Sequence, residues 1–521
     1  MIGAKTPTLR SQPRISLFVF LSGTYAAWKL GNWISDGNYQ ELVYSAVGLA
    51  VCLIALTIAR NWRSGFYLFL VWLLVEDLVR KYLGNNMVIY FAKDVLAGLT
   101  YVALYFAIRR GRAKSFRPPF LLVMSLFFWL TALQVFNPYS PSVLYGVLGM
   151  KIYFYYVPLI FVGYALIRNE ADLRRFLFTC ILLSCVISAL GIVQATAGSQ
   201  VLSPANLPPD IRELGNLSKV APLTDQIFLL PSSVFVSTGR FAFFLVLAAI
   251  LGLGTAGYFI LSAVKGRIIV LASIATIAVA VLLSGSRTAF VYALVSLIAL
   301  TVMFLWGAPW RWGQAHRLTK ALRSSCVFAV LGLALFVFLF PAAASSRWAF
   351  YSQTLTPSSS AFQLSDRAWS YPMHNLLSAF SSPHWVVGNG TGTASLGIQY
   401  VSSVLRKPGP HVWVEEGYGQ LIMELGILGP FLWISWTATL LWSAWKAIRP
   451  LKQTRLFPLA ISILWYAFVL LYPLTYLGLD IFQNFVNNAF LWILIGILFR
   501  LPEISSAISI SGRASAKGSC V

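Results

Sequence analysis

SDRAWSYPMHNLLSAFSSPHWVVGNGTGTASLGIQY at residues 365–400 and HVWVEEGYGQLIMELGILG at residues 411–429 form a polar, glycine-bearing interruption in an otherwise apolar chain. Three of the four histidines lie here, namely His374, His384 and His411. The surrounding residues 345–417 predict a loop of roughly 70 residues, and a loop of that length between helices usually has a function. The loop then runs into an apolar stretch that predicts a long helix.

The rest of the chain has the composition of a membrane protein. Hydrophobic residues make up 58% of it and charged residues only 11%. The class predicted is an all-α polytopic membrane protein, because a β-barrel would need short alternating segments rather than long apolar runs. The formal net charge of +23 would suggest nucleic acid as a partner of a soluble protein. Here we interpret it as anchoring of cytoplasmic loops against anionic lipid, so the lipid bilayer is the expected partner and no nucleic acid is.

Apolar runs long enough to cross a bilayer predict about 12–14 transmembrane helices. The runs fall at 15–31, 41–59, 65–80, 88–108, 118–136, 145–167, 174–196, 240–262, 267–284, 287–309, 322–344, 418–446, 456–476 and 483–500. The first run resembles a signal peptide, but we expect it to remain as a helix because so many spans follow. The five cysteines suggest no disulfide framework, since four lie in apolar runs and one at the C-terminal end.

Every second connection between these runs is basic, which predicts cytoplasmic N- and C-termini. The expected organisation is N-terminal transmembrane helices (1–196), a first periplasmic loop (197–239), central transmembrane helices (240–344), the large periplasmic loop (345–417), C-terminal transmembrane helices (418–500) and a cytoplasmic tail (501–521). Glu76, Asp77, Lys93, Asp94 and Lys151 are costly charges within the spans. These charges indicate either an ion pathway or local pairing, in which Glu76 and Asp94 on neighbouring helices pair with Lys93 or Arg80.

Three arginines are expected at the outer boundary, where positive charge is disfavoured: Arg240, Arg287 and Arg367. Each either snorkels to lipid headgroups or caps a helix, or it binds an anion. Anion binding is the favoured role for Arg287, because this residue sits in a tight turn, VLLSGSRTAF, between two apolar runs. A guanidinium there suits bidentate binding of a lipid-linked pyrophosphate.

The loop offers two further features. Glu415 and Glu416 precede a predicted helix, where acidic residues complement the helix dipole, and Glu415 or His411 is alternatively a general base. The run GNGTGT (Gly388–Thr393) follows no βαβ pattern, so it is interpreted as a flexible turn whose backbone amides are available to an anion. The loop histidines have no metal-ligand spacing, so no metal site and no cofactor are expected.

Three motifs resemble the O-antigen ligase and polysaccharide polymerase family of bacterial inner-membrane proteins. They are SGSRTAF (284–290), DRAWSYPMHNLLSAFSSPHWVVGNGTGTAS (366–395) and EEGYGQLIMELGILGPF (415–431), with SSVFVSTGRFAFFL (232–245) as a weaker likeness. The resemblance covers about residues 230–435. The family's ligases have a histidine eleven residues before the first glycine of the GILG sequence; here that position is Glu415. This departure favours a polymerase or an exopolysaccharide-type member.

The resemblance implies a metal-independent glycosyltransferase of the bacterial inner membrane. Such enzymes take a glycan from an undecaprenyl-pyrophosphate-linked donor and pass it to a glycan or lipid A–core acceptor, alongside other polysaccharide-assembly proteins. Arg287 matches the family's pyrophosphate-binding arginine, and Arg367 matches its loop arginine. The competing interpretations are a transporter or flippase for lipid-linked glycans and a non-catalytic scaffold of an export complex.

Overall fold

The computed structural model describes most of the chain. The residues described are 28–29, 39–84, 86–198, 201–204, 218–220, 227–262, 266–307, 320, 323, 327, 330–332, 334, 337–338, 340–355, 366–395, 398–406, 414–477 and 483–518. The predicted span 15–31 lies largely outside these residues, and the span 322–344 is described only in part. The predicted total of 12–14 helices and the placement of both termini therefore stay predictions.

The described residues are overwhelmingly helical, with one small hairpin of two antiparallel strands, β1 (Ser218–Val220) and β2 (Ile227–Leu229). The helices before the hairpin are α2 (Tyr39–Arg60), α3 (Trp62–Leu83), α4 (Met87–Arg109), α5 (Leu121–Gln134), α6 (Val143–Phe154), α7 (Leu159–Leu166) and α8 (Glu170–Ala197). Those after it are α10 (Thr238–Ser262), α11 (Arg267–Leu283), α12 (Arg287–Gly307), α14 (Pro341–Leu355), η1 (Asp366–Ser370), α16 (Tyr371–Phe380), α17 (Ile398–Leu405), α18 (Gly417–Leu425), α19 (Leu428–Ile448), η2 (Arg449–Leu451), α20 (Phe457–Leu471), α21 (Pro473–Leu477) and α22 (Phe485–Gly518).

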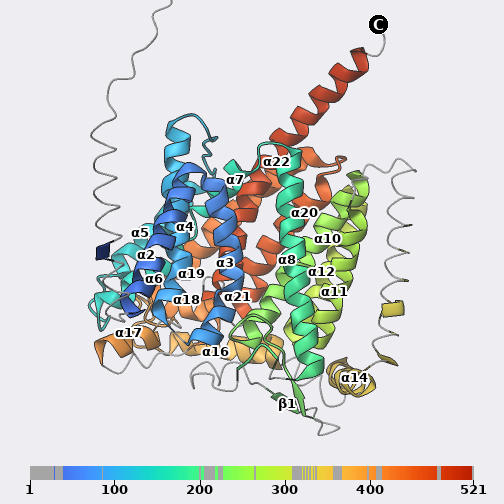
Figure 1. The fold of residues 1–521 in the computed structure, drawn as a ribbon. Helices are drawn as coiled ribbons and strands as arrows, with labels where there is room; N and C mark the ends of the chain where they lie inside the picture. The colour runs from blue at the N-terminus through green and yellow to red at the C-terminus, as the bar shows by residue number, and fades with distance from the viewer. Residues whose placement is uncertain are drawn as a thin grey trace, which may run out of the picture.

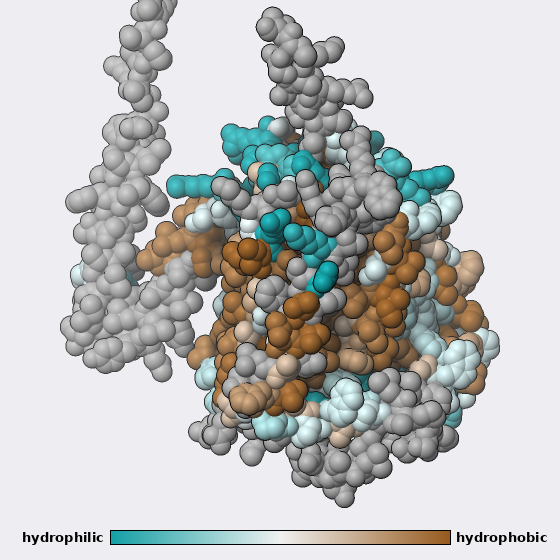
Figure 2. Space-filling model, turned by 90° about the vertical axis from the view of Figure 1, so that its right-hand side faces the viewer, coloured by the Kyte–Doolittle hydropathy of each residue, from teal (hydrophilic) through white to brown (hydrophobic). Residues whose placement is uncertain are grey.

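Seven helical segments among the described residues are long and apolar enough to cross a membrane. They are α4, α6 with α7, α8, α10, α12, α20 with α21, and the first part of α22. Helices satisfy every backbone polar group internally, which lipid requires. Apolar side chains cover much of the middle of the face in Figure 2, and hydrophilic ones gather towards the end from which the C-terminal helix projects. The predicted class, an α-helical membrane protein, is confirmed.

The bundle has two distinct ends (Figure 1). Helices α14, α16 and α17 and strand β1 lie at one end, called the loop end below, and the end of α22 projects from the other. The most buried spans are α10 and α22. Helix α10 packs against α11, α12 and α20, whereas α22 packs against α7 and α3 packs against α4. The start of α10 and the end of α3 both lie at the loop end, which brings distant parts of the sequence together.

Two predicted continuous helices are interrupted. The stretch 418–446 is α18 followed by α19, separated at Gly426, which has φ +73°. A Cβ on Gly426 would lie 2.2 Å from the carbonyl oxygen of Val386, so the break lets the loop backbone approach. The stretch 145–167 is α6 followed by α7, with Pro158 in the interruption. The predicted loop at 345–417 also contains helices, since α14 reaches into it and η1, α16 and α17 lie within it.

Candidate functional site

Eight buried or half-buried charged side chains gather towards the loop end of α3, α4, α6 and α10. We call them the charge cluster: Glu76, Asp77, Arg80, Lys81, Lys93, Asp94, Lys151 and Arg240. Charged groups are buried in proteins when they are paired, because removing an isolated charge from water is costly. With five basic and three acidic members, the cluster has an excess of positive charge when all its members are ionised.

Local sequence places these groups. The last two turns of α3 carry four of the eight charges, and Gly84 and Asn86 form the short connection to α4. The Asn86 side chain accepts a hydrogen bond from the Val88 N–H and so caps the N-terminus of α4. Helix α4 then runs back along α3, which brings Lys93 beside Glu76.

Several ion pairs hold the cluster together, among them Lys151 with Asp94 at 2.6 Å. The Lys93 Nζ lies 2.9 and 3.0 Å from the two carboxylate oxygens of Glu76. The Arg240 Nη1 donates to both carboxylate oxygens of Asp77, at 2.8 and 3.0 Å. Asp77 also accepts from Arg80 at 3.2 Å. The local pairing that the sequence indicated for Glu76 with Lys93 is present, and Asp77 is joined to a helix that begins 161 residues after it in the chain.

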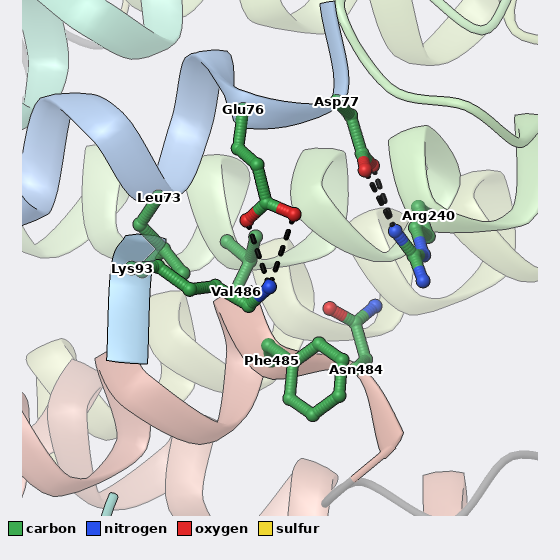
Figure 3. A pocket seen from close by; sticks show the side chains of 8 residues that line it. All are labelled: Leu73, Glu76, Asp77, Lys93, Arg240, Asn484, Phe485 and Val486. Atoms are coloured by element: carbon green, nitrogen blue, oxygen red, sulfur yellow. Dashed lines mark hydrogen bonds and ion pairs between the residues drawn. The ribbon is translucent and has the colours of Figure 1, made fainter. Parts of the chain in front are cut away.

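A small cavity separates the Glu76–Lys93 and Asp77–Arg240 ion pairs (Figure 3). Its volume is about 10 Å³, which is room for about one water molecule. The lining residues are Leu73, Glu76, Asp77, Lys93, Arg240, Asn484, Phe485 and Val486. Glu76 and Lys93 form one wall and Asp77 and Arg240 another, while the start of α22 closes the space from a third side. The cavity therefore combines two carboxylates, two cations and an amide around space for one oxygen atom.

The segment that leads into α10 is fixed by buried polar contacts. Lys81 donates to the Ser232 hydroxyl at 3.0 Å and to the Ser233 carbonyl at 2.8 Å. The side-chain oxygen of Gln194, near the end of α8, accepts hydrogen bonds from the backbone N–H groups of Ser232 and Ser233. The Val236 N–H donates to Asp77. These bonds hold Arg240 in position, and Lys81 is a contributor that the sequence reasoning missed because its partners lie about 150 residues away.

Arg287 opens α12 at the loop end, and its guanidinium lies over the ring of Phe350, 4.7 Å from the centroid. Nearby, Arg347 of α14 donates to the carbonyl oxygens of Leu283 and Leu229 at 3.2 and 2.8 Å. Arg347 is only 6% exposed, so it secures α14 and the β2 strand to the end of α11. This packing fixes the ring on which Arg287 rests.

The loop acids have different surroundings. Glu415 is exposed and accepts a hydrogen bond from the Tyr371 hydroxyl at 2.7 Å. Glu416 is only 1% exposed and caps α18 by accepting the N–H bonds of Tyr418 and Gly419. Burial raises the pKa of Glu416 to about 7, although the two N–H donors oppose that rise. His411 lies outside the described residues, and the Arg367 backbone lies in η1 with its side chain outside them.

The raised pKa of Glu416 predicts a pH-dependent stability. Its folded pKa of about 7 exceeds the ordinary 4.5, so the folded state binds more protons between these values. The free energy of unfolding should therefore fall as pH rises from about 4.5 to 7, by as much as about 3 kcal/mol from this group. Glu416→Gln keeps an oxygen that can cap α18. Thermal unfolding in detergent across this range should show a shallower slope in the variant, and an unchanged slope would contradict the assignment.

The glycine run is a packing element, and the prediction that its amides face an anion is wrong. The N–H groups of Asn389 and Gly390 donate to the carbonyl oxygens of Met423 and Glu424, at 2.8 and 3.0 Å. Farther along, the Ala394 N–H donates to the Glu424 carboxylate at 3.1 Å. Gly388, Gly390 and Gly392 all have positive φ. The run therefore packs against α18, and its backbone N–H groups donate to acceptors within the protein.

The structure brings Arg240, Arg287 and Glu415, the predicted residues whose side chains it describes, to one end of the bundle but not into one contact group. Arg240 lies in the charge cluster, Arg287 lies against α14, and Glu415 lies between α16 and α18. No group of three side chains suited to hold a metal ion occurs among the described residues. Comparisons of the chain with known protein families, with curated proteins and with solved structures find no match.

Proposed function

We propose that the protein is a bacterial inner-membrane glycosyltransferase that polymerises or ligates polysaccharide repeat units. In this proposal the donor is an undecaprenyl-pyrophosphate-linked glycan, which enters at the loop end from the periplasmic face. The acceptor is another lipid-linked glycan or lipid A–core. The proposal combines the motif resemblance in residues 230–435 with the arrangement of charged groups at the loop end.

The observation that carries the proposal is the pairing of α10 and α12. These helices pack against each other and both begin at the loop end. Each has an arginine in its first turn, Arg240 in α10 and Arg287 in α12. A helix N-terminus carries partial positive charge and favours anions, and a guanidinium adds donors that match phosphate oxygens. Both arginines therefore lie at the same end of the bundle, and each suits a phosphate group of a diphosphate.

The ion pair with Asp77 leaves Arg240 able to bind the pyrophosphate as well. Both hydrogen bonds to Asp77 come from Nη1. Figure 3 shows the other guanidinium nitrogens turned away from Asp77, and the side chain is 30% exposed. A guanidinium has five N–H donors, so it can hold a carboxylate and a phosphate oxygen together. Asp77 then acts as the group that orients the arginine.

In the proposed reaction an acceptor hydroxyl attacks the anomeric carbon of the donor glycan. The bond from that carbon to the pyrophosphate breaks, and the leaving group keeps the electron pair. Arg240 and Arg287 stabilise the negative charge that develops on the pyrophosphate. Fixed cationic donors in a site of low water content stabilise such charge strongly, which is why each arginine should matter more for turnover than for folding.

Arg287→Ala should abolish long-chain glycan without loss of protein from the membrane, because Arg287 packs at a helix terminus rather than in the core. The measurement is glycan profiling of a strain that lacks the gene and carries each variant at equal membrane abundance. Arg287→Lys should retain part of the activity, since it keeps the charge but loses the bidentate geometry. The matched control is Arg267→Ala, which removes an exposed arginine from the first turn of α11 at the opposite end. A normal glycan profile in Arg287→Ala would remove this residue from the mechanism.

The same profile separates polymerase from ligase. Single repeat units on the final acceptor without long chains would indicate a missing polymerase. Full-length chains that stay on the lipid carrier, with a bare acceptor, would indicate a missing ligase.

A transporter is the second candidate because α6–α7 and α18–α19 are interrupted spans. However, Glu76, Asp77 and Arg240 lie in the terminal turns of their helices rather than midway along them. Donor that accumulates on the cytoplasmic face of the membrane in the deletion strain would favour the transporter.

A further inference from the structure

We propose that Glu76 is the group that takes the proton from the acceptor hydroxyl, and that the cavity beside it receives the hydroxyl oxygen. The inference rests on the proposed function and names its general base, a role for which the sequence offered Glu415 or His411. It follows from the contents of the cavity, from the bonds of the competing carboxylates and from the position of Arg240.

The cavity has the size and the lining that a hydroxyl oxygen needs. It has room for about one water molecule, and a hydroxyl group occupies about the same space. Glu76, Lys93, Arg240 and Asn484 supply acceptors and donors around it. Polar groups around a one-oxygen space can be satisfied by a single water molecule. An acceptor hydroxyl can replace that water, while its sugar ring stays at the mouth of the cavity.

Glu76 is the carboxylate in the cavity with capacity to accept a proton. Its hydrogen bonds come from Lys93, and the Arg80 Nη1 lies 3.9 Å away, beyond hydrogen-bonding distance. Asp77, by contrast, accepts from Arg240, Arg80 and the Val236 N–H. Three donors, two of them cationic, stabilise the charged form of Asp77 and make it a poor base.

The acids of the loop are placed less well for this role. Glu415 is exposed to solvent and bonded to Tyr371. Glu416 uses its carboxylate to cap α18 and is turned towards the helix backbone. Neither lines the cavity. A general base must lie within hydrogen-bond reach of the proton that it removes, and among these acids only Glu76 also faces a predicted pyrophosphate ligand.

The charged groups around Glu76 are arranged as expected for a general base, with Arg240, the proposed ligand of the leaving pyrophosphate, on another wall of the cavity. Lys93 from α4 lies closest, and Arg80 and Asp77 come from α3 itself. Arg240 from α10 stands on another wall of the cavity, while Asn484 and the first two residues of α22, Phe485 and Val486, line a third side, and none of these three is titratable. In the step, the hydroxyl oxygen bonds to the anomeric carbon, its proton passes to Glu76, and the pyrophosphate departs towards Arg240. Lys93 positions the carboxylate.

The test is glycan transfer by the purified full-length protein in liposomes, with lipid-linked glycan extracted from the deletion strain as the donor probe. Glu76→Gln keeps the shape of the side chain and removes the base. We expect kcat to fall by about 100-fold or more, with KM for the donor unchanged. The wild-type rate should fall at acid pH as Glu76 becomes protonated, and the residual rate of the variant should lack that fall.

A second variant separates catalysis from folding, because Glu76→Gln leaves Lys93 without its counter-charge. The double variant Glu76→Gln with Lys93→Met removes both charges of the pair. If Glu76 is the base, the double variant should recover thermal stability and remain inactive. Recovery of activity in the double variant, or wild-type kcat in Glu76→Gln, would overturn the inference while leaving the proposed function intact. A wild-type protein that transfers no glycan from this donor would overturn both.

Discussion

Gly392→Ala is expected to prevent the accumulation of folded protein in the membrane. Gly392 has φ +79°, a left-handed conformation that costs an ordinary residue about 1–2 kcal/mol. An added Cβ would lie 2.1 Å from the Tyr145 carbonyl oxygen and 3.0 Å from the Gly149 nitrogen. Both atoms belong to the backbone of α6, which cannot move aside as a flexible side chain can. Overpacking adds about 1–3 kcal/mol, so the total of about 2–5 kcal/mol is a large part of the stability of a typical domain.

The measurement is the yield of monodisperse protein after extraction, together with its melting temperature in a single detergent. Gly48→Ala is the control, because Gly48 lies in α2 with nothing within 4 Å of an added Cβ. Alanine forms helix more readily than glycine, so this variant should match or slightly exceed the wild type. Gly392→Ala protein with a wild-type yield and melting temperature would show that the loop backbone does not pack against α6.

Much of the helical arrangement could be predicted from hydrophobicity, because a bilayer requires long apolar runs whatever their neighbours. The predicted runs at 88–108, 174–196 and 240–262 correspond to α4, α8 and α10 within a few residues. The break at Gly426 could not be predicted in this way. It depends on the close approach of Val386, and that contact is visible only once the loop and α18 are folded together. Pro158 favours the other interruption, but the predicted run at 145–167 was continuous.

The candidate site was predictable only in its local part. Glu76, Arg80 and Lys93 are near one another in sequence, and their pairing follows from two antiparallel helices joined by a short turn. The hydrogen-bonded ion pair of Asp77 with Arg240 joins residues 163 positions apart, and the local sequence around neither residue predicts it. The glycine run misled the prediction for the same reason. Glycines that allow flexibility and glycines that allow close packing look alike until their neighbours are known.

Asp77→Asn is expected to destabilise the protein by about 3 kcal/mol or more, because it removes the counter-charge of the buried Arg80 and of the half-buried Arg240. The asparagine oxygen can still accept hydrogen bonds from Arg240 and the Val236 N–H, but its NH2 group cannot accept the bond from Arg80, so the variant removes the charge and one hydrogen bond. Arg80 is 3% exposed and loses an acidic partner at 3.2 Å. A buried cation cannot recover its hydration, so the cost remains in the folded state.

Thermal unfolding in detergent measures this cost, and Lys114→Ala provides the contrast. Lys114 forms an ion pair of 2.9 Å with Glu503 but is 63% exposed, so its removal should cost no more than about 1 kcal/mol. Adding Arg240→Met to Asp77→Asn should recover part of the lost stability, since one uncompensated charge disappears with its partner. If Asp77→Asn unfolds at the wild-type temperature, water must reach the charge cluster. Arg240 would then need no fixed partner to hold its charge at the loop end.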